Sequence, residues 1–233
     1  MSATLPPSET RRVRVGDISL HVRIDGGDGP WVVLAHALGA NHTLWDATAR
    51  HLAPRYRVLR YDLRGHGQSD APIGAYSMIR LADDVACLMD VLEVPAAHFV
   101  GVSVGGMIGQ TAAVRHPERL LSLTLVATVN RTPLDVHPMW HERIGQVEAH
   151  GMAGVAEPDI VLEQAQPRGR DKTHLGSQLP GLLDAVSEVL GQLAVEEHHR
   201  LAHRQGRNFG RQLGDDGGLV SHVHLGVLAL GGK

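Results

Sequence analysis

The 233-residue chain has few aromatic side chains, a single cysteine and no large excess of charge of either sign. The one cysteine, Cys87, excludes an internal disulfide and fits a reducing compartment. It falls in a helix-like segment, where a small buried residue is the expected interpretation and a reactive thiol the alternative. Asp and Glu number 25 against 22 Lys and Arg, and no basic block occurs, so a nucleic-acid partner is not expected.

Long apolar runs are also missing. No window holds about 18 uninterrupted apolar residues, so no membrane span is expected. Residues 1–7 lack the basic patch and apolar stretch of a signal peptide, and we therefore expect a cytoplasmic protein without a membrane partner. The composition, 43% apolar and 20% charged, is ordinary for a globular protein, and 233 residues are enough for one large α/β domain or two small ones. The oligomeric state is not indicated.

The most informative motif is Gly101-Val102-Ser103-Val104-Gly105, which directly follows the apolar run 97–100. A G-x-S-x-G pattern between a strand and a helix is typical of a nucleophile elbow, a sharp turn that strains the serine backbone. Small neighbours permit the close approach, which explains the glycines. The motif predicts that the Ser103 hydroxyl lies at the end of a parallel sheet and reacts by acyl transfer to water. A serine in an ordinary strand-helix turn is the alternative.

Strands and helices alternate along the first half of the chain. Apolar runs predict strands, and a hairpin precedes them. The acidic residues Asp83, Asp84 and Asp90 of the second helix are expected on a solvated face. This alternation specifies parallel β-α-β units, in which ligands bind at the carboxyl ends of strands. The predicted elements are a hairpin at 12–15 and 18–24, strands at 31–35, 56–61, 97–100 and 121–126, and helices at 45–52, 79–92 and 106–115.

A serine nucleophile needs a base for its proton and donors for the oxyanion. The residue after the serine, Val104, is one expected backbone donor, and Leu38 N–H in the segment 36–39 is the other. The alternative for that segment is a simple turn. We interpret His36 and His66 as loop-orienting residues rather than as the base, because loops this rich in Gly, Asp and Arg are commonly held by their own hydrogen bonds.

Three segments together resemble the α/β-hydrolase superfamily: His36 to Gly39, Tyr61 to Ser69 and Gly101 to Gly106. Within it, residues 13–157 are most similar to the 3-oxoadipate enol-lactonases of the β-ketoadipate pathway. The finer match rests on residues 36–41, 44–46, 105–110, 126–132 and 140–144. The resemblance implies an α/β fold, with a mostly parallel sheet and flanking helices in residues 1–130 and the start of a helical lid in 131–157.

The resemblance also implies an activity. Ser103 would be the nucleophile, Leu38 and Val104 the oxyanion hole, and the reaction the opening of a small anionic enol-lactone in aromatic catabolism, without metal or organic cofactor. Trp140 and Arg143 in the lid would meet the anionic lactone; lid packing and solvation are the alternative for these two. Rival functions are a general carboxylesterase and a truncated, non-catalytic remnant that lacks the triad acid and histidine.

Residues 158–233 depart from the family pattern. They contain one aromatic residue, Phe209, against seven before them, and their C-terminal strands are atypical or missing. Helices within 182–213 and a strand within 220–230 are expected. The tail is either a rearranged cap that supplies the base or the product of a shifted reading frame near residue 157. Its scattered histidines lack a metal-site spacing, so no metal is expected. Candidates for the triad acid and base are Asp135, Asp215, Asp216, His222 and His224.

Overall fold

The computed structural model, which describes residues 8–132, 134–155 and 223–224, begins with a β-hairpin. Strands β1 (Ser8–Val15) and β2 (Ile18–Asp25) pair antiparallel on either side of Gly16 and Asp17. Gly16 has a φ of 55°, a left-handed conformation that costs glycine little, and it therefore allows the tight turn. The predicted hairpin is confirmed.

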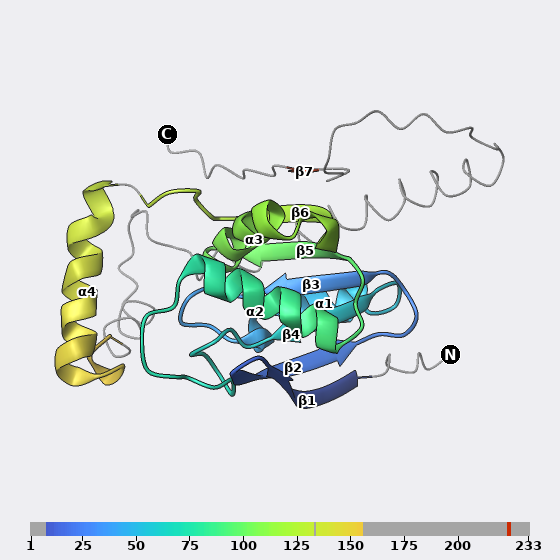
Figure 1. Ribbon diagram of the computed structural model, residues 1–233, viewed down its shortest axis with the longest axis horizontal. Helices are drawn as coiled ribbons and strands as arrows, with labels where there is room; N and C mark the ends of the chain where they lie inside the picture. Colours follow the sequence, from blue (N-terminus) through green and yellow to red (C-terminus); the bar gives the residue numbers. More distant parts are fainter. Residues whose placement is uncertain (1–7, 133, 156–222, 225–233) are drawn as a thin grey trace, which may run out of the picture. The chain divides into compact units, whose positions relative to one another are not determined.

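The sheet is mostly parallel, as predicted, with the strand order β1-β2-β4-β3-β5-β6-β7 (Figure 1). Strand β2 joins β4 antiparallel, and all later pairs are parallel. Every residue of the central strands β3 and β5 is buried, which explains why their sequences are almost continuously apolar. The parallel strands are β3 (Trp31–Ala35), β4 (Arg57–Tyr61), β5 (Ala97–Val102), β6 (Leu120–Val126) and the short β7 (Val223–His224).

Among the residues that the structure describes, three α-helices flank this sheet. Helices α2 (Met78–Val91) and α3 (Val104–Arg115) cover one face, and α1 (Asp46–Leu52) lies on the other (Figure 1). The Ser77 side chain accepts a hydrogen bond from Arg80 N–H and caps α2, whose buried stripe includes Leu81, Val85 and Leu88. Cys87 on α2 is half-buried and packs against the core. Short 3₁₀ helices, η1 (His42–Trp45) and η2 (Pro117–Arg119), precede α1 and β6.

The solvated face predicted for the acidic residues of α2 is wrong for Asp84. Asp84 is buried, and its two oxygens accept hydrogen bonds of 2.7 and 2.8 Å from the Arg64 guanidinium. A buried carboxylate needs a paired, hydrogen-bonding cation. Helical periodicity could not reveal this pair, because Arg64 lies in the loop after β4. Asp83 and Asp90 do lie nearer the surface, where they pair with Arg115 and Arg119.

The chain divides into two compact units: residues 8–128 and β7 belong to the first, and residues 129–155 belong to the second. The second unit contains the 3₁₀ helix η3 (Leu134–Val136) and helix α4 (His137–His150), which ends at Gly151 with a φ of 67°. A helix is thus present where the start of a lid is predicted; its role as a lid stays a prediction. In the part of the chain that the structure describes, no helix is long and apolar enough to cross a membrane. The helices predicted within 182–213 lie outside that part.

Candidate active site

Ser103 lies between the last residue of β5 and the first residue of α3. Its φ of 53° and ψ of −118° fall outside the regions that residues with a Cβ adopt without strain. Such a conformation persists only where the surroundings hold it in place, and it is common at reactive sites. The sharp, strained turn predicted from the motif is therefore present.

Two glycines of the motif allow this turn to form. A Cβ on Gly101 would lie 2.6 Å from Gly106 N, and a Cβ on Gly105 would lie 2.7 Å from the carbonyl carbon of Ala35. The same Cβ on Gly105 would lie 2.9 Å from His36 O. All of these atoms are backbone, which cannot give way like a side chain. The start of α3 therefore touches the end of β3, and the loop after β3 begins beside Ser103.

Two imidazoles hold that loop. The buried His36 ring accepts Leu63 N–H at Nε2 (3.0 Å), so its proton is on Nδ1, which donates to Ala37 O (2.8 Å). His66 Nε2 accepts Gly39 N–H (3.3 Å) from the other end of the loop. Burial lowers the pKa of His36 to about 4, which keeps its ring neutral and able to accept at pH 7. Both rings make the loop-orienting contacts expected from the sequence.

The two predicted oxyanion donors lie in the loop after β3 and at the start of α3. Leu38 lies in the loop between the contacts of His36 and His66, and the residue is 55% exposed. Val104 is the first residue of α3. The first N–H groups of an α-helix have no acceptor within the helix, so Val104 N–H can serve a ligand. The role of both groups as an oxyanion hole stays a prediction.

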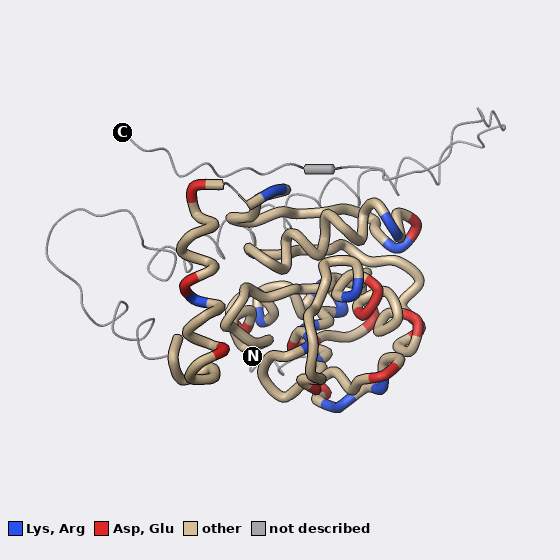
Figure 2. The backbone as a smooth tube through the Cα atoms, turned by 60° about the vertical axis from the view of Figure 1, so that its left-hand side comes forward, with Lys and Arg blue, Asp and Glu red and all other residues tan. Residues whose placement is uncertain are grey.

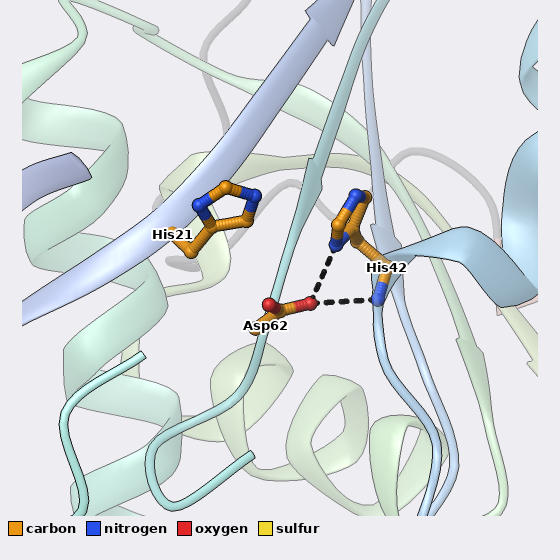
Figure 3. Close-up of side chains that lie close together, drawn as sticks. All are labelled: His21, His42 and Asp62. Atoms are coloured by element: carbon orange, nitrogen blue, oxygen red, sulfur yellow. Dashed lines mark hydrogen bonds and ion pairs between the residues drawn. The ribbon is translucent and has the colours of Figure 1, made fainter. Parts of the chain in front are cut away.

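Asp62 follows β4 and organises the next loop at the same edge of the sheet (Figure 3). Its Oδ1 accepts from both the backbone N–H (2.8 Å) and the ring Nδ1 (2.7 Å) of His42, and its Oδ2 accepts from Gln68 N–H (2.8 Å). Burial pushes the pKa of Asp62 upward, but these hydrogen bonds outweigh it, so the pKa lies below its ordinary value. The carboxylate is therefore ionised at neutral pH.

A second histidine, His21 of β2, completes a buried cluster with His42 and Asp62 (Figure 3). Sequence reasoning missed this group, because it searched for metal ligands by spacing and these three residues meet only in the folded sheet. One ligand atom from each lies within 4.8 Å of the others. Since Asp62 already accepts three hydrogen bonds, we interpret the cluster as a loop-fixing network.

The remaining candidates belong to other elements of the chain. Asp135 lies in η3, and α4 carries Trp140 and Arg143, whose guanidinium carbon is 5.8 Å from the centre of the Trp140 ring. His224 belongs to β7 and pairs in register with Thr124 of β6. Asp215, Asp216 and His222 lie outside the described residues. His36 and His66 are engaged in loop contacts, and among the hydrogen bonds of residues 8–128 and 223–224 none joins a histidine to the Ser103 hydroxyl.

Comparisons with known proteins agree with this geometry. A family model described as "alpha/beta hydrolase fold" matches residues 30–181. The 3-oxoadipate enol-lactonase 2 of Acinetobacter baylyi is 32% identical over 142 residues, which cover 60% of this chain and 52% of the relative. "Putative carbamate hydrolase RutD" of Azorhizobium caulinodans is 37% identical over 201 residues, which cover 80% of this chain and 73% of the relative.

A solved structure gives the same result. The enol-lactonase from Burkholderia xenovorans LB400 superposes with a TM-score of 0.61 at 36% identity, and the match covers 77% of this chain and 66% of that chain. The present chain spans about half the length of the enol-lactonases of Acinetobacter baylyi that it matches. The family match continues to residue 181, past the change of composition near residue 157.

Proposed function

Since the chain belongs to the α/β hydrolase fold family, we propose that it is a serine hydrolase in which Ser103 attacks an ester-like carbonyl. The observation that carries this proposal is the strained backbone of Ser103 at the start of α3, beside the loop that contains Leu38. No structural need of an ordinary strand-helix turn explains a serine with a φ of 53°.

In the proposed reaction, the Ser103 oxygen bonds to the lactone carbonyl carbon while an imidazole accepts the hydroxyl proton. The N–H groups of Leu38 and Val104 stabilise the oxyanion, and donors of this kind contribute about 3 kcal/mol each to catalysis. The ring C–O bond then breaks, and its oxygen takes the proton. Water finally releases the acid from Ser103. The base is sought among His222 and His224, and the acid among Asp135, Asp215 and Asp216.

We propose a small anionic enol-lactone as the substrate, by similarity to the relatives named 3-oxoadipate enol-lactonase and to the solved structure named enol-lactonase. Trp140 and Arg143 of α4 are the proposed contacts of its carboxylate. A carbamate is the second candidate substrate, since the relative with that name aligns with more of this chain. Both substrates present a carbonyl carbon to the same nucleophile, and a general aryl ester would do so too.

Reaction with a fluorophosphonate probe tests the nucleophile directly. We expect the chain to be labelled at Ser103 and Ser103→Ala to be unlabelled, with turnover reduced at least about a thousandfold. The matched control is Ser77→Ala, which removes the cap of α2 and should leave labelling unchanged. Assays with the enol-lactone, an aryl ester and a carbamate then identify the substrate. A folded chain that is not labelled would be a non-catalytic remnant.

A further inference from the structure

The last residue of β6 and the segment after it hold the two backbone groups of Ser103. Ser103 N–H donates to Val126 O at 2.9 Å, and the Thr128 hydroxyl donates to Ser103 O at 2.7 Å. Gly106 and Met107 N–H also donate to this carbonyl, as expected at the first turn of α3. Thr128 is thus the one side chain, among the hydrogen bonds that the structure describes, that bonds to the backbone of the proposed nucleophile.

The chain takes a strained path to bring Thr128 to this place. Ala127, between Val126 and Thr128, has a φ of 44°, in the left-handed region that an alanine rarely adopts. Ala127 directly follows Val126, which accepts the hydrogen bond of the strained Ser103. Its own strain indicates that the position of Thr128 is held by its surroundings. Strain of this kind is common at functional sites, and nothing in the β6 strand itself requires it.

Packing fixes the position of the Thr128 side chain against α3. A Cβ on Gly106 would lie 2.6 Å from both Cβ and Cγ2 of Thr128 and 2.8 Å from its Oγ1. The third glycine of the segment 101–106 is therefore explained by Thr128, which packs directly against the first turn of α3. From this packed position the Thr128 hydroxyl donates to the Ser103 carbonyl.

The Ser103 carbonyl and Val104 N–H belong to the same peptide unit. Because that unit is planar and trans, the two groups point in opposite directions, and a hydrogen bond to the oxygen fixes the direction of the N–H. A hydrogen bond to the oxygen also polarises the unit and strengthens the N–H as a donor. The geometry therefore links the Thr128 hydroxyl to the proposed oxyanion donor on Val104.

We propose that Thr128 is a positioning residue that aims and polarises Val104 N–H toward the developing oxyanion, an inference that rests on the proposed function for its catalytic consequence. It acts through the Ser103–Val104 peptide and does not touch the substrate. Loss of the hydroxyl should therefore slow the chemical step and leave substrate binding nearly unchanged.

The test compares Thr128→Val, Thr128→Ser and wild type by fluorophosphonate labelling and by steady-state hydrolysis of an aryl ester. We expect Thr128→Val to label and turn over about three- to tenfold more slowly, the effect of one hydrogen bond, with KM within about twofold. Thr128→Ser should restore the rate, because it keeps the hydroxyl. The matched control is Thr124→Val on β6, whose hydroxyl is buried without a hydrogen-bond partner among the described residues.

Equal rates for Thr128→Val and wild type would overturn the proposal, and so would a Thr128→Ser rate as low as that of Thr128→Val. Thr128→Ala replaces Thr128→Val if the latter does not fold. The amide proton shift of Val104, measured by NMR, is a readout independent of activity: it should move in Thr128→Val and stay in Thr124→Val. If wild type is not labelled, the proposed function fails, while an unmoved Val104 shift would refute the role of Thr128.

Discussion

Gly105 is the residue at which the backbone of α3 comes closest to β3. A Cβ there would lie 2.7 Å from the Ala35 carbonyl carbon and 2.9 Å from His36 O, so Gly105→Ala must push the helix away from the strand. We expect this substitution to lower the free energy of unfolding by about 3 kcal/mol, near the upper end of the usual cost of overpacking. Urea unfolding followed by circular dichroism measures the change.

Gly27 supplies the control for that experiment. A Cβ on Gly27 would meet no atom within 4 Å, and Gly27 has no positive φ, so Gly27→Ala should shift the urea midpoint very little. If both variants unfold at the same urea concentration, the structure tolerates a Cβ at Gly105, and the close approach of α3 to β3 does not require a glycine there.

Residues whose role is local could be predicted from the sequence, and residues that act across the sheet could not. Ser103 and its glycines stand within five positions of one another, so their turn chemistry is visible in a short window. Thr128 follows a different strand, and His21 joins Asp62 and His42 from β2. No spacing connects these residues, because only the strand order brings them together.

At the scale of elements, burial explains why the strands were predictable. Strands β3 and β5 are covered on both faces, and an almost continuous apolar run is a strong signal. The polar side chains inside the sheet gave no such signal. Arg60 on β4 is buried, and its guanidinium donates to both Asp25 of β2 and His42 O in η1. It therefore ties a strand and a helix to β4.

We expect Arg60→Met to destabilise the protein by about 3 kcal/mol, because the half-exposed Arg23 is then the only ion-pair partner that the described residues offer to the buried Asp25 carboxylate. Burial raises the pKa of Asp25, but its bonds to Arg60 outweigh that effect and keep the carboxylate charged. The double variant Arg60→Met/Asp25→Leu should recover at least half of the loss. Urea unfolding of both variants measures this.

The surface pair Arg115–Asp83 is the control for the buried one. It has two hydrogen bonds of 2.9 Å, yet both side chains are 39% exposed, so Arg115→Met should cost less than about 1 kcal/mol. A cost equal to that of Arg60→Met, or a double variant as unstable as the single one, would contradict the view that the buried charge of Asp25 is what demands Arg60.

At the scale of the whole molecule, Lys, Arg, Asp and Glu are interspersed along residues 8–128, without a large region of one sign (Figure 2). Surface repulsion is therefore not expected to dominate the response to pH.

The position of the catalytic base also depends on the fold of the whole molecule. In an α/β hydrolase the histidine reaches the serine through the tertiary fold, so local patterns among His222 and His224 could not assign it.

The buried histidines make the stability of the molecule fall in acid before the carboxylates titrate. Folded His36 takes up a proton only near pH 4, whereas the unfolded chain does so near pH 6.5. Between these values the unfolded state binds more protons, so falling pH favours unfolding; above pH 6.5 the contribution of His36 is complete. It amounts to about 3 kcal/mol, lost between pH 6.5 and pH 4. Burial lowers the pKa of His21 as well, in the same direction.

Urea unfolding at pH 7, 5.5 and 4 tests this expectation in wild type, in His36→Gln and in the exposed-site control His51→Gln. His36→Gln should be less stable at pH 7, because it disturbs the bonds to Ala37 and Leu63, but its stability should change less between pH 7 and pH 4. His51→Gln should follow wild type. Below about pH 3.8 the lowered pKa values of Asp25 and Asp62 add a second loss, which all three proteins share. Parallel pH profiles for wild type and His36→Gln would contradict this expectation, because they would show that burial does not keep the His36 ring neutral.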